Sequence, residues 1–199
     1  MTETFLDCID FDRLGKAMEN TQNNVKYFEE MTDSIVNSYT SSLDGIMKDI
    51  YKDIINIDYS PPLNVLERYF LELSNCIYFL GEKLEHLGIY NAMSKSAYKE
   101  VYNNSYLSHT IKDDDKKNKM TVAELTATAE KDAQYESVVN DVYDKAYSIV
   151  KSKLSSANIM ISSLSKIISR RINEMNLSQT TPSGKQILNE ELNTFHPTV

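Results

Sequence analysis

Side chains that could do catalytic or metal chemistry are few in this chain and lie far apart in the sequence. The three histidines, His86, His109 and His196, have no cysteine or acid at the spacing of a metal site. The five glycines never approach the spacing of a phosphate-binding loop, and no third group would orient Cys8 and His86 as nucleophile and base. We therefore predict a protein that is not an enzyme, with no catalytic residues, no metal site and no cofactor.

Basic residues gather in one acid-free stretch near the end of the chain. Six of the 21 basic residues lie between Lys145 and Asn173, where no Asp or Glu occurs, although the whole chain has 29 acids and a net charge of −8. A helical wheel separates an apolar arc from a serine-rich face. Cations among small hydroxyl donors suit a phosphate backbone. The predicted nucleic-acid-binding residues on this face are Lys145, Lys151, Lys166 and Arg170.

Three other interpretations of these features stay open. The basic segment could dock on acidic helices of the same or another subunit, or lie on an anionic membrane, although its apolar face lacks Trp and Phe anchors. Tyrosines spaced along the helices, such as Tyr98, Tyr102 and Tyr106, could stack bases. The simpler expectation for these tyrosines is the half-buried boundary of helix packing.

Long helices must position these residues, because Gly and Pro are scarce: five and four among 199 residues. Helical periodicity predicts helices at about 11–57, 63–88 and 93–107, the first ending before Pro61 and the second capped by Gly88. A polar linker at 108–120 should follow this N-terminal region, 1–107. Thr121 and Glu124 predict a capping box that opens a long C-terminal helix over 121–176. The remainder, 177–199, is predicted to be a mobile tail broken at Thr181–Gly184.

One sustained heptad seam predicts lengthwise helix packing. The seam residues are Leu66, Phe70, Leu73, Ile77, Leu80 and Leu84. We predict an elongated all-α helical hairpin or bundle with a long coiled-coil-like C-terminal helix. A helix of this length has to pack on another long helix, which favours a homo-oligomer held by the seam; a monomeric hairpin is the alternative. Lys153 and Arg171 project toward the apolar arc and are assigned to the same subunit interface.

The N-terminal sequence and the hydropathy predict an intracellular protein. Residues 1–12 carry four acids and no basic segment of the kind found in secretory signals. Apolar runs such as Cys76–Leu80 are far shorter than the roughly 20 residues that span a bilayer. We therefore expect a cytoplasmic protein with no membrane partner.

The segment 121–176 resembles the C-terminal part of UvsY-type phage recombination mediators. A capped helix with Asp132 and Tyr135 leads into a long heptad-like rod that closes on Ile168-Ser169-Arg170-Arg171-Ile172. The resemblance implies an oligomer that binds single-stranded DNA and helps load a recombinase onto DNA coated by single-strand-binding protein. It covers about 55 residues, and residues 1–120 have no counterpart in it.

Two functions follow as expectations. The first is a phage-type recombination or replication accessory protein in the cytoplasm of a host cell, which binds single-stranded DNA non-specifically and contacts a recombinase or single-strand-binding protein. The second is a structural or adaptor protein, a coiled-coil oligomer or virion component that binds no nucleic acid. Salt-dependent binding of an oligonucleotide distinguishes them, because only phosphate contacts release counterions.

Overall fold

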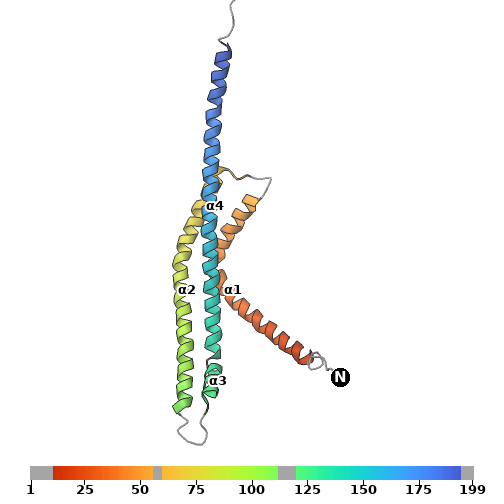
Figure 1. Cartoon of the computed structure of the whole chain (residues 1–199), viewed down its shortest axis with the longest axis vertical. Helices are drawn as coiled ribbons and strands as arrows, with labels where there is room; N and C mark the ends of the chain where they lie inside the picture. The colour runs from red at the N-terminus through yellow and green to blue at the C-terminus, as the bar shows by residue number, and fades with distance from the viewer. Residues whose placement is uncertain (1–10, 56–59, 112–119, 194–199) are drawn as a thin grey trace, which may run out of the picture. The chain divides into compact units, whose positions relative to one another are not determined.

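The computed structural model describes residues 11–55, 60–111 and 120–193 of the chain (Figure 1). These residues form helices and no strand, so the predicted all-α class is confirmed. The helices are α1 (Phe11–Ile55), α2 (Leu63–Ile111), α3 (Val122–Asp132) and α4 (Gln134–Asn193). Ile57, most of the linker predicted at 108–120, Cys8 and His196 lie outside the described residues.

The second and third predicted helices are one continuous helix, α2, so the predicted helix end at Gly88 is wrong. No glycine among the described residues has a positive φ, the backbone conformation that a left-handed cap requires. Gly88 is instead a point of close approach. A Cβ atom at this position would lie 3.3 Å from Cε2 of Tyr147, which comes from α4. The absent side chain makes room for an aromatic ring and does not end the helix.

The predicted helix 121–176 differs from the structure in two ways: it is interrupted at Ala133, and it extends beyond its predicted end. Its predicted start is confirmed, since Thr121 and Glu124 form both hydrogen bonds of a capping box. At Ala133 the helix is interrupted between α3 and α4, yet the Ala133 N–H still donates to the Ala129 carbonyl at 3.0 Å. α4 then continues through Pro182 to Asn193, past the predicted break. A proline inside a helix removes one backbone hydrogen bond and crowds the preceding turn, which is why the sequence predicted a break here.

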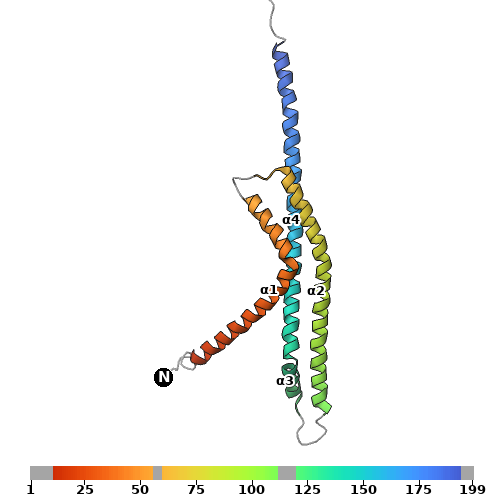
Figure 2. The same ribbon diagram turned by 180° about the vertical axis from the view of Figure 1, so that it is seen from behind.

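The chain divides into two compact units, and each takes pieces of α1, α2 and α4. The first unit contains residues 1–41 and 80–153. Within it, α2 and α4 lie side by side in both views, whereas the N-terminal part of α1 stands away from them (Figures 1 and 2). Its buried side chains are Thr32, Val36, Thr40, Leu80, Leu84, Leu87, Ser94, Leu125, Ala129, Ala133, Val142, Ala146 and Val150.

The second unit contains residues 42–79 and 154–199. Large aliphatic side chains from all three helices fill its centre, and its buried side chains include Leu43, Ile50, Leu66, Tyr69, Leu73, Ala157 and Leu164. Tyr69 adds a polar contact at the edge, where its hydroxyl donates to Oδ2 of Asp53 at 2.6 Å. This bond joins α1 to α2 on either side of the connection at 56–62.

Gly81 and Gly88 make a matched pair of tests on α2. Alanine favours helix over glycine by up to about 1 kcal/mol, and nothing lies within 4 Å of a Cβ built on Gly81. Gly81→Ala should therefore raise the free energy of unfolding by about 1 kcal/mol. Gly88→Ala should gain less, because the new methyl group presses on Tyr147. Denaturant unfolding measures both, and equal gains would contradict the close approach at Gly88.

Tyr69→Phe tests the bond between α1 and α2. The variant should lose about 2 kcal/mol of unfolding free energy at neutral pH, because the Asp53 carboxylate loses a hydrogen bond. That bond, with burial, raises the pKa of Tyr69 from 10.0 to about 12. The stabilisation is therefore complete below about pH 10 and is lost as the pH rises toward about 12. Unfolding across this range should show the wild type and the variant converging, and a constant difference would contradict the assignment.

Candidate nucleic-acid interface

Lys145 and Lys151 lie on α4 in the first unit, and both side chains are exposed. Among the described residues, no carboxylate lies within ion-pair distance of either ammonium group. The Lys151 Nζ lies 5.9 Å from the centre of the Tyr147 ring, at the outer limit of a cation–π contact. Both cations are therefore open to an anion that approaches from solvent.

Lys166 and Arg170 lie on α4 in the second unit, and both are also exposed. Lys166 has no carboxylate partner among the described residues. Arg170 does: its Nε lies 2.9 Å from Oε1 of Glu174, one helical turn further on, just beyond the acid-free stretch. With the two side chains 82% and 53% exposed, such a pair contributes less than about 1 kcal/mol. Glu174 therefore competes with a phosphate for Arg170, but the ion pair is too weak to prevent phosphate binding.

Serines of this face are less available as donors than the sequence suggested. The hydroxyls of Ser162 and Ser163 donate to the carbonyl oxygens of Asn158 and Ile159 at 3.1 and 3.0 Å. A hydroxyl has one hydrogen, so these two serines can accept a hydrogen bond but cannot also donate one to a phosphate. To donate to a phosphate, each of these two hydroxyls would first have to give up its bond to the helix carbonyl.

Lys153 and Arg171 point inward, as the helical wheel predicted, and bond within their own chain. The Lys153 Nζ donates to Oγ1 of Thr40 at 3.1 Å in the first unit. In the second unit, Nη2 of Arg171 donates to the Ser60 hydroxyl. Both were assigned to a subunit interface, and the structure instead gives each of them a partner on another segment of the same chain.

The seam residues also have neighbours in the single chain. Leu66, Leu73, Leu80 and Leu84 are buried in it, while Phe70 and Ile77 are half-buried. The packing that was expected to join subunits therefore occurs between helices of one chain, as in the hairpin alternative.

Five tyrosine rings lie against other tyrosine rings. The Tyr98, Tyr102 and Tyr106 rings succeed one another along α2 with centre separations of 6.2 and 6.4 Å, and all three are half-buried. Tyr90 and Tyr143 stack across α2 and α4 at 5.9 Å. These contacts suit the packing interpretation better than a free platform for bases.

A polar cluster at the α2–α3 connection was missed from the sequence. Asp132 accepts a hydrogen bond from the Ser105 hydroxyl at 2.6 Å and lies 3.4 Å from Nε2 of His109. The bond from Ser105, helped by His109, lowers the pKa of the Asp132 carboxyl below its ordinary value. Antiparallel packing of the helices on either side of the linker could have suggested that polar residues of their facing ends meet. Within the described ranges, no three His, Cys, Asp or Glu side chains gather as a metal site.

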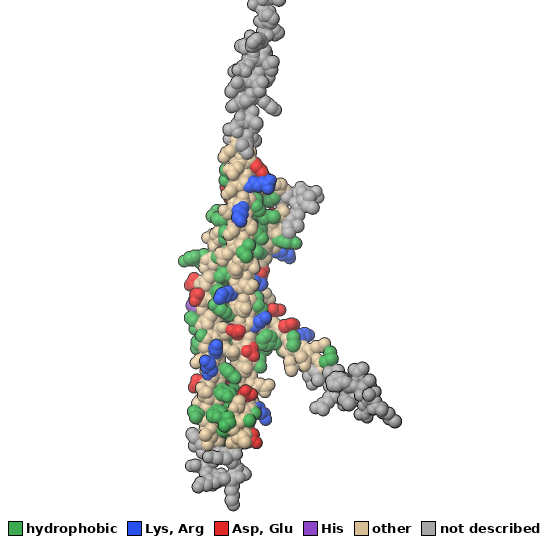
Figure 3. Space-filling view, in the orientation of Figure 1, with side chains coloured by type: hydrophobic (Ala, Val, Ile, Leu, Met, Phe, Trp, Pro, Cys, Tyr) green, Lys and Arg blue, Asp and Glu red, His purple; other side chains and the backbone are tan. Residues whose placement is uncertain are grey.

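Comparison with protein-family models, curated proteins and solved structures finds no match for this chain. In the part of the chain that the structure describes, no helix is long and apolar enough to cross a bilayer. On the face seen in Figure 3, Lys and Arg side chains stand apart, separated by polar and hydrophobic ones. Each cation is therefore described by its own exposure and its own partners.

Lys153 and Lys151 allow a matched test of the inward and outward positions. Lys153→Ala should lower the free energy of unfolding by about 1–2 kcal/mol, because Thr40 is fully buried and loses a hydrogen-bond donor. Lys151→Ala should change it by no more than about 0.5 kcal/mol. The Lys153 effect should not vary with protein concentration, since its partner is in the same chain. If the loss of unfolding free energy in Lys153→Ala changed with protein concentration, Lys153 would instead lie between subunits.

Proposed function

We propose that this chain is a single-strand-binding accessory protein of recombination or replication, whose phosphate contacts are Lys145, Lys151, Lys166 and Arg170. The observation that carries the proposal is the exposure of four cations on one helix, three of which have no ion-pair partner among the described residues. Exposed ammonium and guanidinium groups attract phosphates and displace their counterions. Contacts of this kind bind without regard to base sequence.

The acidic remainder of the chain fits a weak and selective binder of this kind. A net charge of −8 repels nucleic acid over most of the surface, so attraction is confined to the acid-free stretch. Acidic helices also offer a surface for basic partner proteins. By its resemblance to UvsY-type mediators, we propose a recombinase or a single-strand-binding protein as the partner, within the cytoplasm of a phage-infected host.

A second candidate is a helical adaptor that binds no nucleic acid. It is favoured by apolar side chains left exposed on several helices, among them Tyr27, Tyr78, Met93 and Ile159 at 67%, 74%, 63% and 66%. Exposed apolar faces of this kind are typical of protein-binding surfaces. An adaptor would assemble with proteins and show no affinity for an oligonucleotide even at low salt.

Lys166→Gln combined with Arg170→Gln tests the first candidate. The variant should bind a fluorescent oligothymidylate at least tenfold more weakly, because two phosphate contacts are lost. The slope of log affinity against log salt should become shallower by roughly 0.7 for each lost contact. Fluorescence anisotropy over a salt series measures both quantities, and circular dichroism checks that helix content is unchanged.

Lys83→Gln combined with Lys95→Gln removes the same charge from exposed positions on α2 and serves as the control. It should bind like the wild type apart from a small uniform loss. If the wild type fails to bind at low salt, or both variants weaken binding equally, the nucleic-acid proposal is wrong and the adaptor is favoured.

A further inference from the structure

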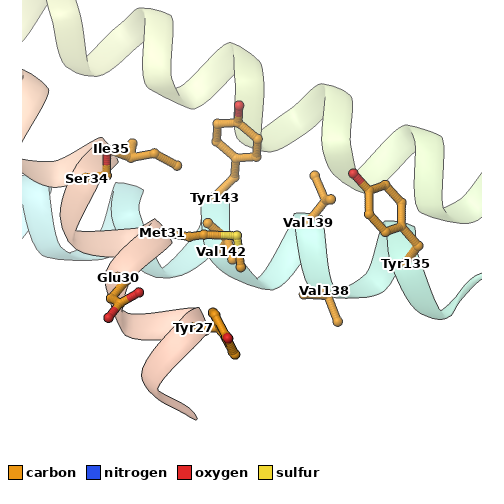
Figure 4. A pocket seen from close by; sticks show the side chains of 10 residues that line it. All are labelled: Tyr27, Glu30, Met31, Ser34, Ile35, Tyr135, Val138, Val139, Val142 and Tyr143. Atoms are coloured by element: carbon orange, nitrogen blue, oxygen red, sulfur yellow. The ribbon is translucent and has the colours of Figure 1, made fainter. Parts of the chain in front are cut away.

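An open apolar groove lies in the first unit. It encloses about 590 Å³ between α1 and the beginning of α4 (Figure 4). The α1 wall consists of Tyr27, Glu30, Met31, Ser34 and Ile35, and the α4 wall of Tyr135, Val138, Val139, Val142 and Tyr143. In the close-up, Met31 of α1 points toward Val142 of α4.

The apolar side chains of the groove are incompletely covered. Tyr27 and Met31 are 67% and 47% exposed on one wall, and Tyr135 and Val138 are 76% and 42% exposed on the other. Thr32 and Val36, which lie on a different face of α1, are buried. Two helices with facing apolar stripes and open space between them form the kind of site that accepts a third helix.

Charge determines which helix this can be. The helical stretches that carry the walls, 27–35 and 135–143, contain five carboxylates and no Lys or Arg, and of these carboxylates Glu30 lines the groove itself. Lys26 and Lys145 lie just outside them. Lys26 approaches Glu30 at 3.9 Å with both side chains exposed, a pair too weak to neutralise the wall. An occupant with basic side chains would be attracted, whereas two such grooves would repel each other.

The chain itself contains a helix of the required kind. In the second unit, α4 from 154 to 176 exposes Ile159 at 66% between serines, with Lys166 and Arg170 on the same side of the helix. Small serines permit a close approach of backbones, Ile159 supplies an apolar anchor, and the two cations match the acidic walls. Glu174 is the single acid of this segment.

We propose that the groove binds the 154–176 segment of a second copy of this chain. The contact joins two different surfaces, groove and basic helix, and so is heterologous. It needs no nucleic acid and stands independently of the proposed function. Lys166 and Arg170 belong both to this contact and to the proposed phosphate contacts. Copies joined in this way would therefore expose these two cations to an oligonucleotide only after separating.

The experiment measures the mass of the full-length protein by sedimentation velocity at low and high salt. The wild type should exceed the 22.8 kDa monomer at low salt and approach it as salt rises, because screening weakens attraction between the opposite charges. Glu30→Lys with Asp141→Lys should give a monomer; Glu30 lines the groove, and Asp141 is an exposed acid in the stretch of α4 that carries the other wall. Lys166→Glu with Arg170→Glu should give the same result. Mixing the two monomeric variants should restore a complex, because one keeps the basic helix and the other keeps the groove.

The control is Glu82→Lys with Glu85→Lys, which makes the same charge change at exposed positions on α2 outside the groove lining. It should keep the wild-type mass, and circular dichroism should show equal helix content in every variant. A monomeric wild type at low salt, groove variants that remain associated, or a mixture that stays monomeric would each overturn the proposal. Oligonucleotide binding by the groove variant is measured separately. If this variant still binds the oligonucleotide, the proposed function stands even where the proposed contact between copies fails.

Discussion

Each long helix of this protein buries one face, and the buried residues recur every seven positions. The rest of the structure depends on this constraint. α2 buries Leu66, Leu73, Leu80, Leu87 and Ser94 at exact seven-residue intervals. Val36, Leu43 and Ile50 repeat the interval on α1, and Val150, Ala157 and Leu164 repeat it on α4. Two turns of helix contain about 7.2 residues, so a seven-residue repeat keeps one stripe directed at neighbouring helices over many turns. Helices this long gain their stability from that stripe, since local propensity alone would leave them marginal.

The same stripe decides which charged side chains stay available. A residue of α4 that falls inside the buried arc must find a partner there, and Lys153 and Arg171 find hydroxyls on other segments of the chain. Residues on the opposite arc remain in solvent, where Lys145, Lys151 and Lys166 have no ion-pair partner in the described part of the chain. Whether a cation of α4 bonds within the chain or stays in solvent thus depends on its angular position around the helix axis. Any function that uses the basic face depends on packing that occurs on the other side of the helix.

Surfaces left over by this packing have opposite character in the two units. The first unit ends in an acidic groove with apolar walls, and the second carries a cationic helix face with an exposed isoleucine. Electrostatic attraction acts on rates and selectivity of association more than on raw affinity. If both proposals hold, the groove of a second copy and a phosphate backbone compete for the same cations, and salt and ligand concentration decide between them.

Much of this followed from the sequence alone. The scarcity of Gly and Pro predicted long helices, the capping box located the start of α3, and the wheel separated inward from outward cations, because these depend on residues close together in the chain. The remaining features depended on contacts between distant residues. Gly88 looked like a helix end until Tyr147 was found beside it. His109 gained an acid neighbour, and Glu174 reached back to Arg170. Periodicity states which face is buried but not what buries it, so only the tertiary structure assigned the seam to the chain's own helices and left the groove open.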